Sequence, residues 1–247
     1  MNILILEPSA IGNDRTHNFK SLVNFTKVLQ KDGLKVFWMP NIKCQKRLPG
    51  VVSHPKFKYS IYDDNRKRNR NFFRVIRKIP FVRRLRCRYL IKTNYRDILS
   101  ILRKLKFCED DHLFVPTTDW ILFKVLLEII NKEDKPPRIH FLFMYESADW
   151  LTCGYPYATI LKTMKRCRDS KRPVYLYTET TRHAINMGAA LQQPISVCPY
   201  PVLAVNGDSD QEQEITYPDK FIVGILGGGR RDKGFQRVPD IIQSYNS

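Results

Sequence analysis

Short apolar runs alternate with helical segments through residues 1–204, and this alternation limits the fold more than any other feature of the sequence. Helices are expected where apolar residues recur every three or four positions, from Thr16 to a stop at Gly33 and in three later segments. The expected strands are 2–6, 34–39, 112–116, 138–144, 173–177 and 195–198, and the later helices are 117–131, 155–168 and 180–191. Strands that alternate with helices predict a parallel sheet covered on both faces. We therefore expect a Rossmann-like α/β domain with its first strand in the interior of the sheet.

Two stretches interrupt the alternation. Residues 40–65 contain prolines and basic residues with little periodicity, which predicts an irregular excursion. Residues 66–106 predict two helices, 71–79 and 82–106, separated at Pro80. In the second helix, five apolar side chains at helical spacing predict core packing: Ile91, Tyr95, Ile98, Leu102 and Leu105.

The net charge of +18 is concentrated in this basic helical insertion. Residues 66–106 hold 16 Lys and Arg against one acid, Asp97, a net of +15. Phenylalanines and isoleucines are interleaved with the arginines of its first half, which predicts a cationic amphipathic surface for anionic lipid. Two alternatives stay open: a solvated basic face with a packed underside, and a nucleic-acid surface. No nucleic-acid-binding motif accompanies the segment, so we expect no nucleic acid as partner.

Ligands of parallel α/β sheets bind beyond the carboxyl ends of the strands, so polar residues there are the site candidates. After the strand at 138–144, Glu146 and Asp149 lie beside aromatic residues, and a carboxylate there can act as a general base or bind sugar hydroxyls. Further cleft candidates are His17, Asp119, Glu179 and Thr180. The alternative for the acidic and threonine candidates is helix capping. The helix at 117–131 is expected to take Thr117 or Thr118 as its cap.

The stretch 221–236 combines an apolar run, three glycines, a basic cluster and the start of a helical segment. Glycines allow close approach of the backbone to a phosphate, and a helix N-terminus offers free N–H groups. Arg230, Arg231 and Lys233 can neutralise a diphosphate there. The spacing is neither a P-loop nor a complete dinucleotide fingerprint, and a glycine-rich turn with solvated arginines is the alternative.

The segment Gly-Gly-Gly-Arg-Arg-Asp-Lys-Gly-Phe at 227–235 resembles the start of the C-terminal domain in glycosyltransferases of the GT-B fold, family 4 type. The resemblance implies that Arg230 or Arg231 and Lys233 bind the diphosphate of a sugar-nucleotide donor. It implies the same for Gly12 in the loop after the first strand. Glu146 stands where many members of the family have a histidine, and Tyr-Thr-Glu-Thr-Thr-Arg at 177–182 is also similar to the family.

The resemblance implies three regions. Residues 1–204, which end in a Pro-x-Pro similar to the family's, would form the acceptor domain. Residues 205–219, polar and acidic, would form a linker, and 220–247 would begin the donor-binding domain. One strand and one helix cannot bury their own faces, and the paired glutamates of the family are absent. We therefore expect an incomplete second domain and an N-terminal part that is inactive alone.

The expected activity is metal-independent hexosyl transfer from a nucleotide-sugar, a co-substrate rather than a cofactor, to a lipid-linked or polysaccharide acceptor. The alternative is a non-catalytic Rossmann-like module that binds anionic lipid or nucleic acid through 66–106. The six cysteines are widely spaced, which argues against a metal or disulfide framework and for a reducing cytoplasm. With no apolar run of membrane-spanning length, a peripheral location on the inner face of the membrane is expected.

Overall fold

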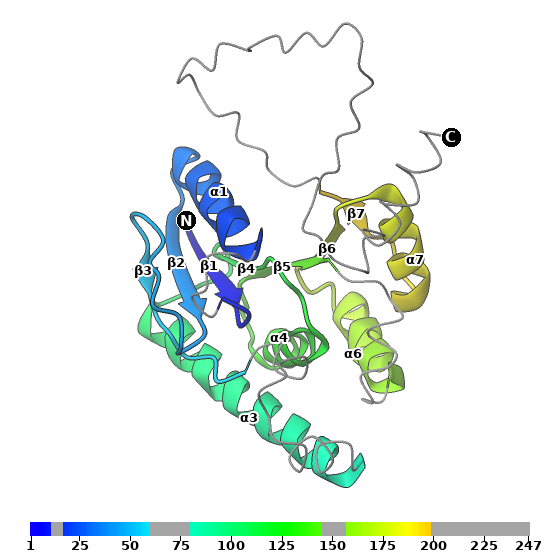
Figure 1. Ribbon diagram of the computed structural model, residues 1–247. Coiled ribbons are helices and arrows are strands. Elements are labelled where there is room, and N and C mark those ends of the chain that lie inside the picture. The colour runs from blue at the N-terminus through cyan, green and yellow to red at the C-terminus, as the bar shows by residue number, and fades with distance from the viewer. Residues whose placement is uncertain (11–16, 60–79, 145–156, 199–247) are drawn as a thin grey trace, which may run out of the picture. The chain divides into compact units, whose positions relative to one another are not determined.

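The computed structural model describes residues 1–10, 17–59, 80–144 and 157–198, all within the compact unit Met1–Leu203 (Figure 1). A seven-stranded sheet, parallel throughout, has the strand order β3-β2-β1-β4-β5-β6-β7. The strands are β1 (Asn2–Glu7), β2 (Lys35–Pro40), β3 (Val52–Ser53), β4 (His112–Val115), β5 (Arg138–Phe143), β6 (Val174–Thr178) and β7 (Ser196–Val197). The expected Rossmann-like α/β fold is confirmed, with β1 in the interior between β2 and β4.

The helices connect successive strands, as the alternation predicted. They are α1 (His17–Lys31), α3 (Pro80–Lys104), α4 (Trp120–Lys132), α6 (Tyr157–Asp169) and α7 (Thr181–Leu191). Pro80 is the first residue of α3, a position where proline costs no helical hydrogen bond. The expected helix 71–79 lies outside the described residues. Within the described ranges, no helix is long and apolar enough to cross a membrane.

The two faces of the sheet carry two separate cores. Leu4 and Leu6 of β1 belong to a large cluster with side chains of α3, α4, α6 and α7. Ile3 and Ile5 point the other way, because side chains alternate along a strand, and pack with apolar residues of α1 such as Leu22. In the part of the chain that the structure describes, α1 is the only helix on this second face.

The stripe expected to be core on α3 does pack inward. Ile91, Ile98 and Leu102 are buried, and Tyr95 and Leu105 pack against the same cluster. The described part of the excursion expected at 40–65 is mostly irregular, but it also contributes a strand, because Val52 and Ser53 form β3 beside Phe37 and Trp38. A two-residue strand held by backbone hydrogen bonds leaves no hydrophobic period in the sequence.

Candidate functional site at the carboxyl edge of the sheet

The sheet reverses its winding between β1 and β4. The chain leaves β1 for α1 on the second face, and it leaves β4 for α4 on the opposite face. The loops that follow these neighbouring strands therefore diverge. In open α/β sheets, ligands bind in the crevice that such a divergence creates at the carboxyl edge. Polar residues at the ends of β1 and β4 are consequently the first candidates for a site.

Glu7, the last residue of β1, is fully buried at this reversal point. Its Oε1 accepts a hydrogen bond from the backbone N–H of Ser9 at 2.9 Å. The pKa of Glu7 is raised to about 7, mainly by burial and also by the nearby charge of Asp119, while Thr117 and Ser9 oppose the rise. The Thr117 hydroxyl lies close to Glu7, but no donor among the described residues has hydrogen-bond geometry to Oε2. Glu7 is therefore a buried carboxyl group with a pKa near neutral pH, and its Oε2 has no hydrogen-bond partner among the described residues.

Asp119 follows β4 and has both oxygens occupied. Oδ1 accepts from the backbone N–H of Leu122 at 2.9 Å, which makes Asp119 the N-cap of α4. Oδ2 accepts from the phenol of Tyr59 at 2.8 Å. Burial raises the pKa of Asp119 to about 6, although these hydrogen bonds favour its charged form. Asp119 thus lies at the expected edge, but its visible contacts are structural.

The prediction that Thr117 or Thr118 caps this helix was wrong. The chain is still bonded to the sheet at this point, since the N–H of Thr118 donates to the carbonyl of Leu142 and its hydroxyl donates to the carbonyl of Val115. Only Asp119 has a side chain free to accept from the first turn of α4.

Comparison with known proteins gives no relative: no family model matches the chain, and no curated protein is significantly similar to it.

A network of side chains holds the reversal point together. Asn41, which follows β2, donates through Nδ2 to the carbonyl oxygens of Pro8 at 3.1 Å and Tyr59 at 2.7 Å. Burial and the neighbouring carboxylates of Asp119 and Glu7 raise the pKa of the Tyr59 phenol well above its ordinary value, so Tyr59 acts as a donor. The loops after β1, β2 and β3 are therefore tied to the N-terminus of α4 beside Glu7.

The end of β6 carries the second group of predicted residues. Thr180 caps α7 and accepts from the N–H of His183 at 3.3 Å, as the capping alternative predicted. Burial raises the pKa of Glu179, and its Oε1 has no hydrogen-bond partner among the described residues. Three strand spacings, roughly 14 Å, separate β6 from β1, so Glu179 and Glu7 lie on one edge without touching.

The remaining candidates cannot be placed in this edge. Gly12, Glu146, Asp149, Arg230, Arg231 and Lys233 lie outside the described residues. His17 is the first residue of α1, whose chain starts from the same edge, but its side chain is not described. Within the described ranges no three His, Cys, Asp or Glu residues form a potential metal cluster.

Sequence reasoning missed Glu7, a fully buried carboxyl group of this edge whose pKa is raised. One signal could have found it: a single acidic residue ends the otherwise apolar run Ile-Leu-Ile-Leu of a buried strand. A charged residue is rarely buried without a specific reason. The position at the end of an interior parallel strand puts that residue at the ligand edge.

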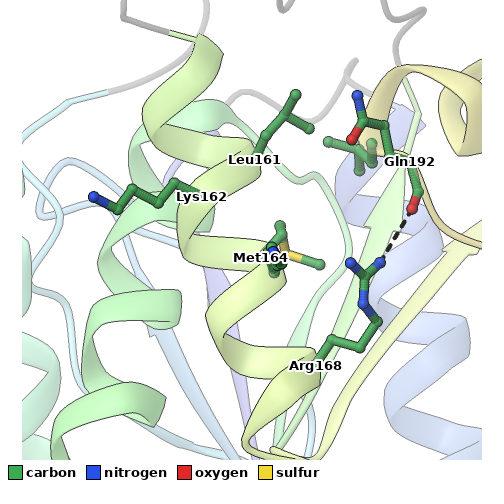
Figure 2. A pocket seen from close by; sticks show the side chains of 7 residues that line it. Leu161, Lys162, Met164, Arg168 and Gln192 are labelled. Carbon is green, nitrogen blue, oxygen red and sulfur yellow. Dashed lines mark hydrogen bonds between the residues drawn. The ribbon is translucent and has the colours of Figure 1, made fainter.

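A separate hollow of about 240 Å³ opens between α6 and α7 (Figure 2). Its lining combines apolar and cationic side chains: Leu161, Lys162, Met164, Lys165, Arg168, Leu191 and Gln192. Nη1 of Arg168 donates to the carbonyl oxygen of Gln192 at 3.2 Å and bridges the ends of the two helices. Those ends lie toward the amino edge of the sheet, because crossover helices run antiparallel to the strands. This hollow is therefore not part of the site at Glu7.

Stacked aromatic rings occupy the second face of the sheet beyond α1. The ring of His140 in β5 stacks against rings of the two neighbouring strands. Its centroid lies 5.0 Å from that of His112 in β4, and 4.8 Å and 6.0 Å from those of Tyr175 and Tyr177 in β6. Nδ1 of His112 lies 2.8 Å from Nε2 of His140, and the Tyr177 hydroxyl lies 3.4 Å from Nδ1 of His140. Burial lowers the pKa of both histidines, to about 4 for His140. Both rings are therefore neutral at pH 7.

Proposed function

We propose that this chain is the acceptor-binding part of a GT-B-type glycosyltransferase that takes a hexosyl group from a nucleotide-sugar. The observation that carries the proposal is Glu7: a buried carboxyl group, with a pKa near 7 and one oxygen without a partner among the described residues, at the reversal point of a parallel sheet. Sugar transfer requires a group that removes the proton of the acceptor hydroxyl, and efficient bases have a pKa near the working pH.

The resemblance of residues 227–235 supports the choice of reaction class, and Glu7 supports the chemistry. In this proposal Glu7 accepts the hydroxyl proton of a lipid-linked or polysaccharide acceptor. Tyr59 and Asp119 keep the edge in position, and Glu179 binds acceptor hydroxyls farther along it. Glu146 and Asp149 remain further candidates for the same cleft. Arg230, Arg231 and Lys233 bind the donor diphosphate, with Gly12 close to it, and no metal takes part.

The proposed reaction takes place at the cytoplasmic side of a membrane. No cofactor beyond the nucleotide-sugar co-substrate is involved.

The second candidate function is a non-catalytic module that binds anionic lipid or nucleic acid through its basic insertion. One observation favours it: apolar and basic side chains share the exposed side of α3. Activity assays separate the two functions, because the module would bind without transferring sugar.

The test is transfer of labelled hexose from UDP- and GDP-sugars to a lipid-phosphate acceptor, by the natural full-length protein that contains these 247 residues. Glu7→Gln should lower kcat by a factor of roughly 10² to 10⁴, the usual contribution of a general base. The matched control, Glu109→Gln, removes an exposed carboxylate of a different loop and should leave kcat unchanged.

The donor part is tested separately with Lys233→Ala. Loss of a charge-assisted phosphate contact should weaken donor use about 10- to 100-fold, since such contacts are worth roughly 1.5–3 kcal/mol. Wild-type kcat in Glu7→Gln would remove Glu7 from the reaction. Absence of both nucleotide-sugar binding and transfer in the full-length protein would leave the binding-module function.

A further inference from the structure

The N-terminal half of α3 exposes large apolar side chains of the kind that are usually buried in a protein core. Phe81, Leu85 and Tyr89 are 68%, 49% and 61% exposed. They follow one another at intervals of four residues, so they form a stripe along one side of the helix. In Figure 1 this end of α3 extends past α4, away from the strands.

Basic side chains occupy the same side of the helix. At 100° per residue, the three apolar residues and Arg84, Arg88, Lys92 and Arg96 lie within a sector of roughly 140°. No hydrogen bond or ion pair joins these four cations to any other described residue, and the first turn of α3 has no acidic residue. The sector, which we call the α3 stripe, is therefore both apolar and uncompensated in charge.

Other sides of α3 are already packed. Leu90, Ile91 and Ile98 are buried in the large core cluster. The α3 stripe is thus not the face by which α3 packs on the sheet, and the packing of the fold does not explain its exposure. Exposed apolar side chains in a row usually indicate an interaction surface.

From this pattern we infer that the α3 stripe docks on an anionic lipid bilayer. Side chains such as Phe81 and Leu85 can enter the headgroup region, while arginine and lysine stems extend to the lipid phosphates. The charge of the stripe complements an anionic leaflet. A nucleic acid would match the charge but not the aliphatic Leu85, which has no ring face for base stacking. The inference does not depend on sugar transfer.

The experiment is co-sedimentation of the 247-residue chain with vesicles of phosphatidylcholine containing 30% phosphatidylglycerol, at low and high salt. Each basic residue near such a surface strengthens binding about fivefold at low salt. R84Q/R88Q should therefore bind roughly 25-fold more weakly and lose about half of the salt dependence contributed by the four cations of the stripe, since Lys92 and Arg96 remain. Phe81→Ser/Leu85→Ser/Tyr89→Ser should bind at least tenfold more weakly and keep its salt dependence, because its charges remain.

Two matched controls test whether the site is local. Ile185→Ser removes an apolar side chain that is 66% exposed on α7, and K162Q/K165Q removes two cations from the rim of the α6–α7 hollow. Both should bind vesicles like the wild type. All variants should keep the wild-type Tm, since the changed side chains are on the surface.

Three results would overturn the inference. They are wild-type vesicle binding by the triple serine variant, an equal loss of binding in K162Q/K165Q, and tighter binding to single-stranded RNA than to the anionic vesicles. Loss of sugar transfer with intact vesicle binding would affect only the transferase proposal, because the vesicle assay contains no nucleotide-sugar.

Discussion

The phenol of Tyr59 donates a hydrogen bond to Oδ2 of Asp119 across 2.8 Å, and both residues are buried. This bond connects the chain after β3 with the N-cap of α4, two segments separated by sixty residues. With this bond, both carboxylate oxygens of Asp119 accept a hydrogen bond. The two acidic residues of this edge therefore differ in their contacts. Asp119 stabilises the edge, and Oε2 of Glu7 has no hydrogen-bond partner among the described residues.

Tyr59→Phe should destabilise the fold by about 1–3 kcal/mol, because Oδ2 of Asp119 loses its donor while it stays buried. The loss should be smaller at pH 5 than at pH 8, since the pKa of Asp119 is about 6 and a protonated carboxyl needs no donor. Urea unfolding at the two pH values measures this. The control is Tyr175→Phe, which removes an exposed hydroxyl and should change stability by less than about 0.5 kcal/mol. Equal losses in both variants would contradict the role of the bond.

Glu7→Gln should stabilise the fold at high pH. The folded-state pKa of about 7 lies above the ordinary value of 4.5, so the folded protein holds a proton that the unfolded chain releases between these pH values. Stability due to Glu7 therefore falls as pH rises from 4.5 to 7, by up to about 3 kcal/mol. The difference in unfolding free energy between Glu7→Gln and wild type should grow over that range and level off above it. A difference independent of pH would mean that Glu7 is not buried as described.

Acid should loosen the stacked histidines. Nε2 of His112 lies 3.2 Å from the sulfur of Met1, which can only accept, so Nε2 carries the hydrogen and Nδ1 accepts from His140. His140 then accepts from Tyr177 through its own Nδ1. Protonation of His112 at Nδ1 sets two N–H groups against each other, whereas a proton on Nδ1 of His140 turns the Tyr177 hydroxyl into the acceptor. Burial is the largest cause that lowers the pKa of both rings.

Stability due to His140 is therefore complete above pH 6.5 and is lost as pH falls toward 4, by up to about 3 kcal/mol. His140→Phe keeps a ring in the stack but cannot titrate, so its unfolding free energy should change less between pH 7 and pH 4.5 than that of wild type. Ile185→Ser, an exposed change on α7 that removes no titratable group, is the control and should follow the wild-type curve. Parallel curves for His140→Phe and wild type would exclude this contribution.

Replacing Lys124, a buried cation between α4 and α6, by a neutral side chain should cost less stability than removing its partner Glu128. Nζ of Lys124 lies 3.2 Å from Oε1 of Glu128 and 3.1 Å from Oγ1 of Thr163, and only 8% of its side chain is exposed. Glu128→Ala should cost about 1–3 kcal/mol, because the ammonium stays buried, whereas Lys124→Met should cost less than about 1 kcal/mol. Thermal and urea unfolding measure both. For comparison, Glu109→Ala breaks an exposed pair with Lys135 and should have little effect. The reverse order for Lys124 and Glu128 would contradict the argument.

Local pattern was sufficient for most of the elements. The apolar run of β1 reflects burial on both faces of the sheet, and the helical period of α3 reflects burial of one side of the helix, so both patterns are visible in the sequence. The errors fell where backbone pairing or a neighbouring segment decided the outcome. Val52 and Ser53 form a strand because they pair with β2. Thr118 does not cap α4 because its N–H is hydrogen-bonded to the carbonyl of Leu142 in β5.

The class of fold, the parallel sheet and the edge where polar residues gather can be predicted from the order of residues alone, because hydrophobic periodicity is a local consequence of burial. Which of those residues meet depends on how the chain folds in three dimensions. The sheet places β1 beside β4, so Glu7 feels the charge of Asp119, while Glu179 lies three strands away. Strand order and depth of burial depend on contacts between distant segments, and the pKa of a carboxyl group follows that burial. For this reason the burial and the raised pKa of Glu7 follow from the structure and not from the sequence.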